Sequence, residues 1–258
     1  MMNLIDRRGV LVGLGAVSAL VACPAFAATD QVLADVIANG PRAAADKARD
    51  SWRHPYASLV FWGLNPGMTV IEVDPGQGWW TDILAPYLAR TGGHYIATAA
   101  DLADPKVSDG AKKGRAAFEA KYQGDPKLYG DVRTVGFGAV SGPLAPAGTV
   151  DLVLVSRETH NWVKPAGFMQ KALGDFHAAL KPAGVLAIED HRAPDGADPA
   201  KGDGYISEAY MIGEARKGGF VLGGAIGDQR QSEGHQGPSV RGLDPAADPA
   251  EFCVRPAR

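Results

Sequence analysis

The amino-acid sequence predicts an α/β fold with one mainly parallel β-sheet and helices on both of its faces. The first observation is that short apolar segments alternate with helical ones from Thr69 onward. The second is that 258 residues, of which 46% are hydrophobic and 21% charged, match a globular domain with a sizeable core. The third is that 33 Gly and 18 Pro residues mark many turns without any internal repeat. We therefore expect a single domain over residues 28–258.

The first part of this domain predicts an N-terminal helical extension over residues 28–66. Asp30 is placed to cap a short helix with Leu33, Val36 and Ile37 on one face, which a Gly-Pro pair ends. The Ala-rich, charged segment 42–53 predicts a second helix, and it stops before a proline.

The rest of the domain predicts seven strands and the helices between them. Strands are expected at residues 69–74, 94–99, 131–137, 150–155, 185–190, 219–226 and 251–255. Helices are expected at residues 79–88, 110–122, 168–180 and 205–216, and Lys181–Gly184 reads as a tight turn. Residues 228–249 are polar and rich in Gly and Pro, which predicts a long loop before the last strand.

Residues 1–27 predict an export signal. Arg7 and Arg8 precede an apolar, uncharged run and an Ala-x-Ala cleavage site at residues 25–27. The arginine pair resembles the bacterial twin-arginine signal, which exports folded proteins. The alternative is a lipoprotein signal that anchors the chain through Cys23. We therefore expect a periplasmic or otherwise exported bacterial protein with no membrane span.

Charge and cysteine content narrow the functional classes. Lys and Arg total 26 and Asp and Glu total 29, so the net charge of −3 argues against a nucleic-acid partner. With only two cysteines, a disulfide framework is excluded, and Cys253 is most simply a packed strand residue. A small molecule is therefore the expected substrate, whereas the oligomeric state is not indicated.

A glycine-containing turn follows the first predicted strand. Gly76 and Gly78 allow a sharp backbone turn and the close approach of a ligand. Glu72 lies near the carboxyl end of that strand, where it can accept hydrogen bonds from ligand hydroxyls or an ammonium group. In open α/β sheets ligands bind at this edge. The segment therefore predicts a ligand-binding turn.

These residues resemble the first motif of class I S-adenosylmethionine-dependent methyltransferases, an acid followed by a Gly-x-Gly-x-Gly loop. Asp74 stands where the family has its first glycine, and Gly76 and Gly78 match the other two. The resemblance extends to an exported bacterial group of predicted methyltransferases. It rests on short motifs at residues 49–55, 66–70, 75–79, 84–86 and 190–193, together with the final strand.

The resemblance implies a fold and a cofactor. The family's sheet has the order 3-2-1-4-5-7-6, with the last strand antiparallel. S-adenosylmethionine would be bound by the turn from Glu72 to Trp79, including Asp74. One of the two indoles, Trp79 or Trp80, would cover the cofactor while the other packs in the core. An acid after the second strand usually bonds the ribose hydroxyls in this family, and Asp101 is the nearest acid here.

Two histidines follow other strands at the same sheet edge. His160 and His191 are candidates for a general base that deprotonates the methyl acceptor. His160 reads equally as a hydrogen-bonded loop residue. His191 is expected to have a structural or substrate-orienting role, with Asp190 as its partner or as a helix cap. The two histidines and Asp190 also suggest a metal site, but their spacing does not support one, so no metal is expected.

Two function classes remain after these observations. The first is a small-molecule methyltransferase that uses S-adenosylmethionine. The second is a non-catalytic small-molecule-binding protein that keeps the methyltransferase fold. A nicotinamide-dependent oxidoreductase is a weaker third reading, because the loop lacks Gly-x-Gly-x-x-Gly.

Overall fold

The computed structural model describes residues 30–164, 166–226 and 249–256. The export signal predicted at residues 1–27, including Cys23, lies outside these ranges. So do residues 228–248 of the predicted polar loop, while Pro249 already begins the last strand. The chain divides at Asp30, and the unit Gln31–Arg258 contains the fold. No helix in the described ranges has the length and apolar character that a bilayer crossing needs.

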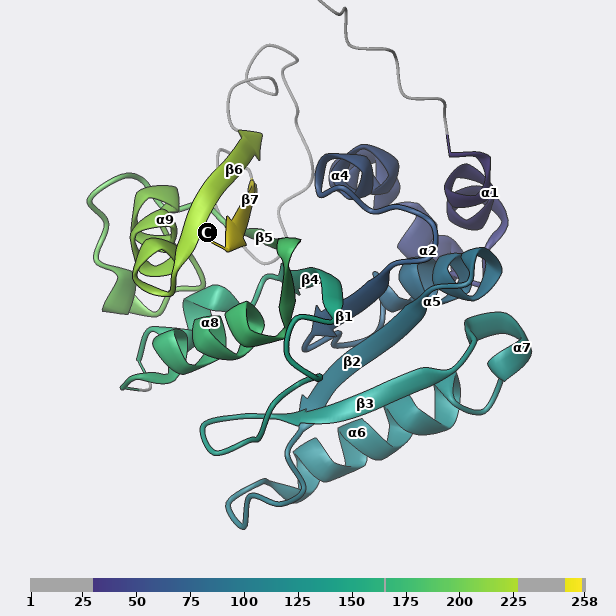
Figure 1. The fold of residues 1–258 in the computed structure, drawn as a ribbon, viewed down its shortest axis with the longest axis horizontal. Helices are drawn as coiled ribbons and strands as arrows, with labels where there is room; N and C mark the ends of the chain where they lie inside the picture. The colour runs from purple at the N-terminus through teal and green to yellow at the C-terminus, as the bar shows by residue number, and fades with distance from the viewer. Residues whose placement is uncertain (1–29, 165, 227–248, 257–258) are drawn as a thin grey trace, which may run out of the picture. The chain divides into compact units, whose positions relative to one another are not determined.

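Seven strands form one sheet in the order β3-β2-β1-β4-β5-β7-β6 (Figure 1). The strands are β1 Thr69–Val73, β2 His94–Ala100, β3 Val132–Phe137, β4 Val150–Ser156, β5 Leu180–His191, β6 Phe220–Ile226 and β7 Pro249–Pro256. The first five run parallel, and β7 pairs antiparallel with both β5 and β6. This sheet confirms the order expected from the methyltransferase resemblance.

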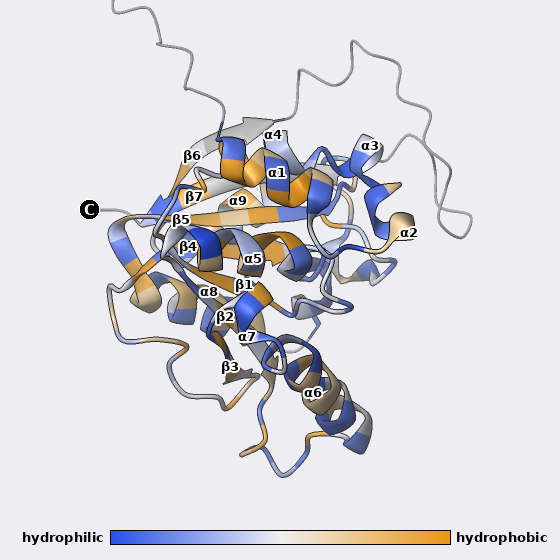
Figure 2. Cartoon of the chain, turned by 90° about the vertical axis from the view of Figure 1, so that its right-hand side faces the viewer, coloured by the Kyte–Doolittle hydropathy of each residue, from blue (hydrophilic) through white to orange (hydrophobic). Residues whose placement is uncertain are grey.

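Helices cover both faces of this sheet, as predicted. The helices are α1 Gln31–Asn39, α2 Ala44–Lys47, α3 Asp50–Arg53, α4 Pro55–Phe61, α5 Thr81–Thr91, α6 Asp109–Tyr122, α7 Pro126–Tyr129, α8 Phe168–Ala179 and α9 Glu208–Lys217. Buried residues of α1, α4, α5 and α7 join one core, and those of α8 and α9 join the other. In Figure 2 the central strands are mainly orange, whereas α6 alternates blue with paler segments.

The central strands divide their side chains between the two cores. In β4, Leu152 and Leu154 pack on the face covered by α5, and Val153 and Val155 pack on the face covered by α8. This alternation follows from the two-residue period of a strand with both faces buried. The carboxyl ends of β1, β4 and β5 therefore lie side by side at one rim of the sheet.

The N-terminal extension differs from the single helix predicted at residues 42–53. Two short helices, α2 and α3, replace it. Buried Arg42 bonds Asp50, with Nη2 at 2.7 Å from Oδ2, and also bonds the Ile37 carbonyl at 2.7 Å. Residues eight apart on a straight helix are separated by about 12 Å along its axis, so this ion pair favours a folded segment. Pro55 then begins α4, since proline suits the first turn of a helix.

Strand β5 is longer than predicted. Lys181–Gly184, expected as a tight turn before the strand, lies inside it. Leu180 pairs with Val150, and the register then shifts so that Val185 pairs with Leu152. The segment that reads as a turn is therefore an irregularity within a strand, which resembles a bulge more than a connection. The other predicted boundaries differ from the structure by only a few residues.

Candidate functional site

The two glycines of the turn after β1 have different surroundings. Asp74, Gly76 and Gly78 all have positive φ, at 47°, 58° and 84°. A Cβ atom added to Gly76 would meet no heavy atom within 4 Å, so the backbone there faces open space. A Cβ atom on Gly78 would lie 1.8 Å from the Tyr122 hydroxyl oxygen. Gly76 therefore leaves room for a ligand, whereas Gly78 allows the turn to pack against α6.

Asp74 occupies the left-handed conformation that favours glycine, and Asp tolerates it better than most residues. Its backbone amide donates to the Thr98 hydroxyl at 2.9 Å. Burial, followed by the negative charge of Glu158, raises the pKa of Asp74 to about 6. Because Asp74 follows β1 and Glu158 follows β4, two carboxyl groups interact across the rim of the sheet.

Glu72 is buried beneath this turn. It is 2% exposed, and its Oε2 atom accepts hydrogen bonds from the Tyr95 hydroxyl at 2.6 Å and the Thr81 hydroxyl at 2.9 Å. Burial raises the pKa of Glu72 to about 7, although these two bonds oppose that rise. One carboxylate oxygen is thus engaged by the protein core, and the ligand contact expected of Glu72 stays a prediction.

Asp101 follows β2 directly. Its Oδ1 atom accepts a hydrogen bond from the Ala103 amide at 3.0 Å. A Cβ atom built on Gly136 of β3 would lie 2.8 Å from the same oxygen. The carboxylate therefore stabilises a local turn against β3, and its predicted contact with a ribose is untested.

The two indoles after the turn are both buried, at 6% exposure for Trp79 and 2% for Trp80. Trp79 Nε1 donates to the Asp46 carbonyl at 3.0 Å, which fastens the turn to the N-terminal extension. Trp80 Nε1 lies 3.2 Å from the Ser156 hydroxyl and 3.3 Å from Glu189 Oε2. The indoles thus connect the β1 turn to the extension on one side and to the ends of β4 and β5 on the other.

His160 and Asp190 form a side-chain pair at the ends of β4 and β5. His160 lies in the short helix η1, Thr159–Trp162, and its Nδ1 atom is 2.7 Å from Asp190 Oδ1. Asp190 is fully buried and also accepts from the Thr159 hydroxyl and from the amides of His160 and His191. The ring that Asp190 holds is therefore that of His160 and not that of His191, the partner expected from the sequence.

The two histidines have opposite electrostatic settings. The hydrogen bond to Asp190 raises the pKa of His160 above its ordinary value, against the effect of burial. Burial, followed by the positive charge of Arg157, lowers the pKa of His191. Their ring centroids are 6.3 Å apart, and the His191 ring is 5.7 Å from that of Tyr205. His160 is thus the stronger base of the two.

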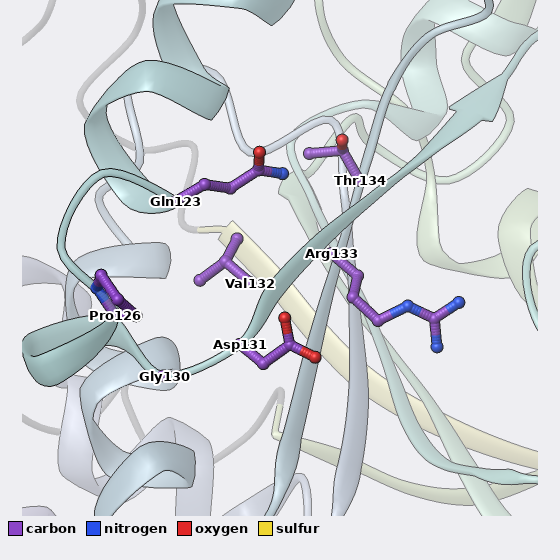
Figure 3. A pocket seen from close by; sticks show the side chains of 7 residues that line it. All are labelled: Gln123, Pro126, Gly130, Asp131, Val132, Arg133 and Thr134. Atoms are coloured by element: carbon purple, nitrogen blue, oxygen red, sulfur yellow. The ribbon is translucent and has the colours of Figure 1, made fainter.

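A cavity of about 500 Å³ adjoins His160. It is lined by His160, Asn161, Lys164, Gly202, Asp203 and Gly204. A second cavity of about 510 Å³ lies at the amino end of β3 and the connection before it (Figure 3). Since β3 runs parallel to β1 and β4, that end belongs to the opposite rim of the sheet. Of these two cavities, the one beside His160 adjoins the candidate site.

Sequence reasoning missed a buried carboxylate, Glu189. It is 1% exposed and accepts from the Ser156 hydroxyl at 2.7 Å, while its Oε1 atom is 3.2 Å from Arg157 Nη2. Burial opposes ionisation, but the charges of Arg157 and Arg53 and the hydrogen bonds from Ser156 and Trp80 together outweigh it, so the pKa of Glu189 lies below its ordinary value. The sequence feature that points to Glu189 is an acidic residue within the apolar segment 185–190, because a charge buried in a strand requires partners.

The remaining metal hypothesis finds no structural support in the described ranges. No three His, Cys, Asp or Glu residues there gather into a group suited to a metal ion. His160 and Asp190 instead bond one another directly, which gives the carboxylate an orienting role.

Comparisons with known proteins agree with the fold. A SAM-dependent methyltransferase from Aquifex aeolicus is 20% identical, with a TM-score of 0.52 over 81% of this chain and 92% of that one. A provisionally assigned sarcosine dimethylglycine methyltransferase from Galdieria sulphuraria is 14% identical, with a TM-score of 0.55 over 83% and 88% of the two chains. The trans-methyltransferase CalH, solved with SAH, is 17% identical, with a TM-score of 0.52 over 83% and 59%.

No protein-family model and no curated protein sequence matches the chain. At these identities the structural likeness establishes the fold, which is that of SAM-dependent methyltransferases. What the site does must be argued from its own residues.

Proposed function

We propose that the protein is an S-adenosylmethionine-dependent methyltransferase that acts on a small molecule. The observation that carries the proposal is the pair formed by His160 and the fully buried Asp190, with Nδ1 and Oδ1 2.7 Å apart. The pair lies where β4 and β5 end. The neighbouring strand β1 is followed by the turn that has open space for a ligand at Gly76. The methyltransferase neighbours and the net charge of −3 support this class of reaction and a small acceptor.

The residues of the β1 turn fit the cofactor. The open space at Gly76 is where a side chain would block a ligand, and Asp74 and Glu158 place negative charge beside it. When bound, S-adenosylmethionine supplies an electrophilic methyl group on a positively charged sulfur, which carboxylates favour. We assign the donor side to Asp74, Gly76 and Glu158, with Asp101 as the candidate for the ribose.

His160 would act on the acceptor. Its Nδ1 atom donates to Asp190, so the neutral ring keeps a lone pair on Nε2 that accepts a proton from the acceptor's nucleophile. Asp190 fixes this tautomer and stabilises the imidazolium that forms. Because the neutral ring is the active form, turnover should rise as the pH increases through the raised pKa of His160.

The first experiment is calorimetry with S-adenosylhomocysteine and with NAD as the control ligand. We expect the first to bind and the second not to bind. The second experiment measures label transfer from methyl-labelled S-adenosylmethionine to pooled hydroxyl, amine and thiol acceptors. His160→Ala should lower transfer by about 10² to 10⁴. His94→Ala removes an exposed histidine at the start of β2, at the other rim, and should change nothing.

Two observations favour a second candidate, a non-catalytic binding protein. The Asp101 carboxylate is engaged by the Ala103 amide, and an acid replaces the first glycine of the turn, so both departures weaken the expected donor site. Tight binding of S-adenosylhomocysteine with no label transfer to any acceptor would support this second candidate. Binding of NAD alone would contradict the methyltransferase proposal.

We also propose that the protein is exported, on the evidence of the charged, apolar and small-residue pattern in residues 1–27. The N-terminus of the exported form should be Ala28. An acylated Cys23 detected by mass spectrometry would identify a lipid-anchored protein instead.

A further inference from the structure

The N-terminal extension gathers arginines around the buried Trp79. The guanidinium carbons of Arg42, Arg49 and Arg53 lie 5.4, 5.9 and 4.5 Å from its ring centroid. Arg42 pairs with Asp50 and Arg49 pairs with Asp46. These two arginines therefore serve the structure of the extension itself.

Arg53 is different. Within residues 30–164, 166–226 and 249–256, no carboxylate lies within ion-pairing distance of its guanidinium group. Burial, followed by the charge of Arg157, lowers the pKa of Arg53 to about 10, although Glu189 acts in the opposite direction. Contacts also link Arg53 to Arg157, because the Trp79 ring beneath Arg53 lies 4.6 Å from the Trp80 ring, and Trp80 and Arg157 both bond Glu189. A guanidinium near a second cation, without a carboxylate bonded to it, is a candidate for an anionic ligand.

Arg157 supplies the second cation. Its φ of 63° is unusual for a residue other than glycine, and its amide donates to the Glu189 carbonyl at 2.6 Å. Nη2 bonds Glu189 at 3.2 Å, but the buried Nε atom has no hydrogen-bond partner among the described residues. A buried donor without a partner is costly, so this atom also indicates a ligand.

The two arginines share one carboxylate. Glu189 acts on both, and its other oxygen already accepts from Ser156 and Trp80. Asp46 also acts on Arg53, but it is paired with Arg49. The charge of Arg157 acts on His191 as well, because it disfavours protonation of that ring.

We propose that Arg53 and Arg157 form a binding site for an oxyanion, a carboxylate or phosphate group carried by a small-molecule ligand. Planar guanidinium groups match the oxygens of such anions in two-point hydrogen bonds. The inference rests on the proposed function, since the acceptor is the ligand we expect to carry the group. The charge of Arg157 acts on His191, whose ring is 6.3 Å from that of His160, and Arg157 follows β4 as His160 does, so the anion would lie on the side of the base.

The test titrates the full chain with inorganic phosphate and with acetate, and follows affinity by calorimetry. Arg53→Gln keeps the ion pair of Arg157 with Glu189, so it should fold, as circular dichroism will check. We expect it to bind phosphate at least tenfold more weakly, while Arg53→Lys loses less. Arg157→Gln should weaken binding similarly. The matched control is Arg90→Gln, which removes an exposed arginine paired with Asp35. Equal phosphate affinity in Arg53→Gln and the parent would overturn the proposal.

A second titration identifies the source of the anion. S-adenosylhomocysteine carries a carboxylate, whereas 5′-methylthioadenosine has the same nucleoside thioether without it. If the acceptor supplies the anion, as we expect, Arg53→Gln binds both nucleosides as the parent does. If the cofactor supplies it, only S-adenosylhomocysteine loses affinity, and the oxyanion site is assigned to the donor. If the parent binds neither nucleoside but binds phosphate, the methyltransferase proposal fails while the oxyanion site stands.

Discussion

Replacing Asp190 by Asn would test the role of the His160 pair most directly. In the parent, Asp190 Oδ1 accepts from His160 Nδ1 at 2.7 Å and from the His191 amide at 2.8 Å. The Asn side chain keeps one oxygen for the Thr159 hydroxyl and the His160 amide, but it presents an NH2 group to the ring. His160 must then accept at Nδ1, which places its proton on Nε2 and removes the base.

The expected effects follow from these contacts. Turnover should fall by about 10² to 10⁴, as expected for loss of a general base. The His191 amide loses its acceptor, so the free energy of unfolding should fall by about 1 to 3 kcal/mol. The pKa of His160 should also move down, because the hydrogen bond to the Asp190 carboxylate, the largest cause of its raised value, no longer favours the charged ring.

Nitrogen NMR of the imidazole rings supplies a readout that needs no acceptor. The parent should show His160 protonated at Nδ1 when neutral, and Asp190→Asn should show it protonated at Nε2. Asp203→Asn is the matched control, because Asp203 raises the pKa of His160 through its charge without bonding the ring. It should lower the pKa and leave the tautomer unchanged. If Asp190→Asn keeps the parent tautomer and turnover, Asp190 does not orient a base.

Two further predictions concern the β1 turn. Gly76→Ala and Gly92→Ala both place alanine at positive φ in open space and should each lose about 1 to 2 kcal/mol of stability. Only Gly76→Ala should weaken the binding of S-adenosylhomocysteine, and equal affinities would place the ligand elsewhere. The second prediction concerns Glu72, whose pKa is raised from 4.5 to about 7. Ionised Glu72 is therefore disfavoured in the fold, and stability should fall by about 3 kcal/mol as the pH rises through this range. Glu72→Gln should remove this fall in denaturation experiments at pH 4 and 8, and an unchanged pH dependence would contradict the reasoning.

The sheet was largely predictable because its strands have apolar sequences and are separated by helical segments. The exception was Lys181–Gly184, where Pro and Gly predict a turn from local composition. The structure shows that pairing of Leu180 with Val150 keeps this segment within the strand. Local residue preferences do not report such a long-range pairing, so tertiary structure decided the outcome.

The site was predictable in its placement but not in its contacts. His160 and Asp190 were both expected at the same rim, since the carboxyl ends of parallel strands meet there. Which ring the carboxylate holds depends on side-chain directions that spacing does not determine. Arg53 was harder to assign, because helical periodicity does not reveal that its helix packs against the turn after β1 through Trp79.

The position of β7 has a consequence for how the sheet assembles while the chain is being synthesised. β7 lies between β5 and β6 although it follows both in the sequence. Until the ribosome has made Pro249–Pro256, β6 has no neighbouring strand and the outer edge of β5 is an open template for pairing. A nascent chain halted before this segment would therefore expose one unpaired strand and one open strand edge to aggregation, even though the parallel half of the sheet has all its residues.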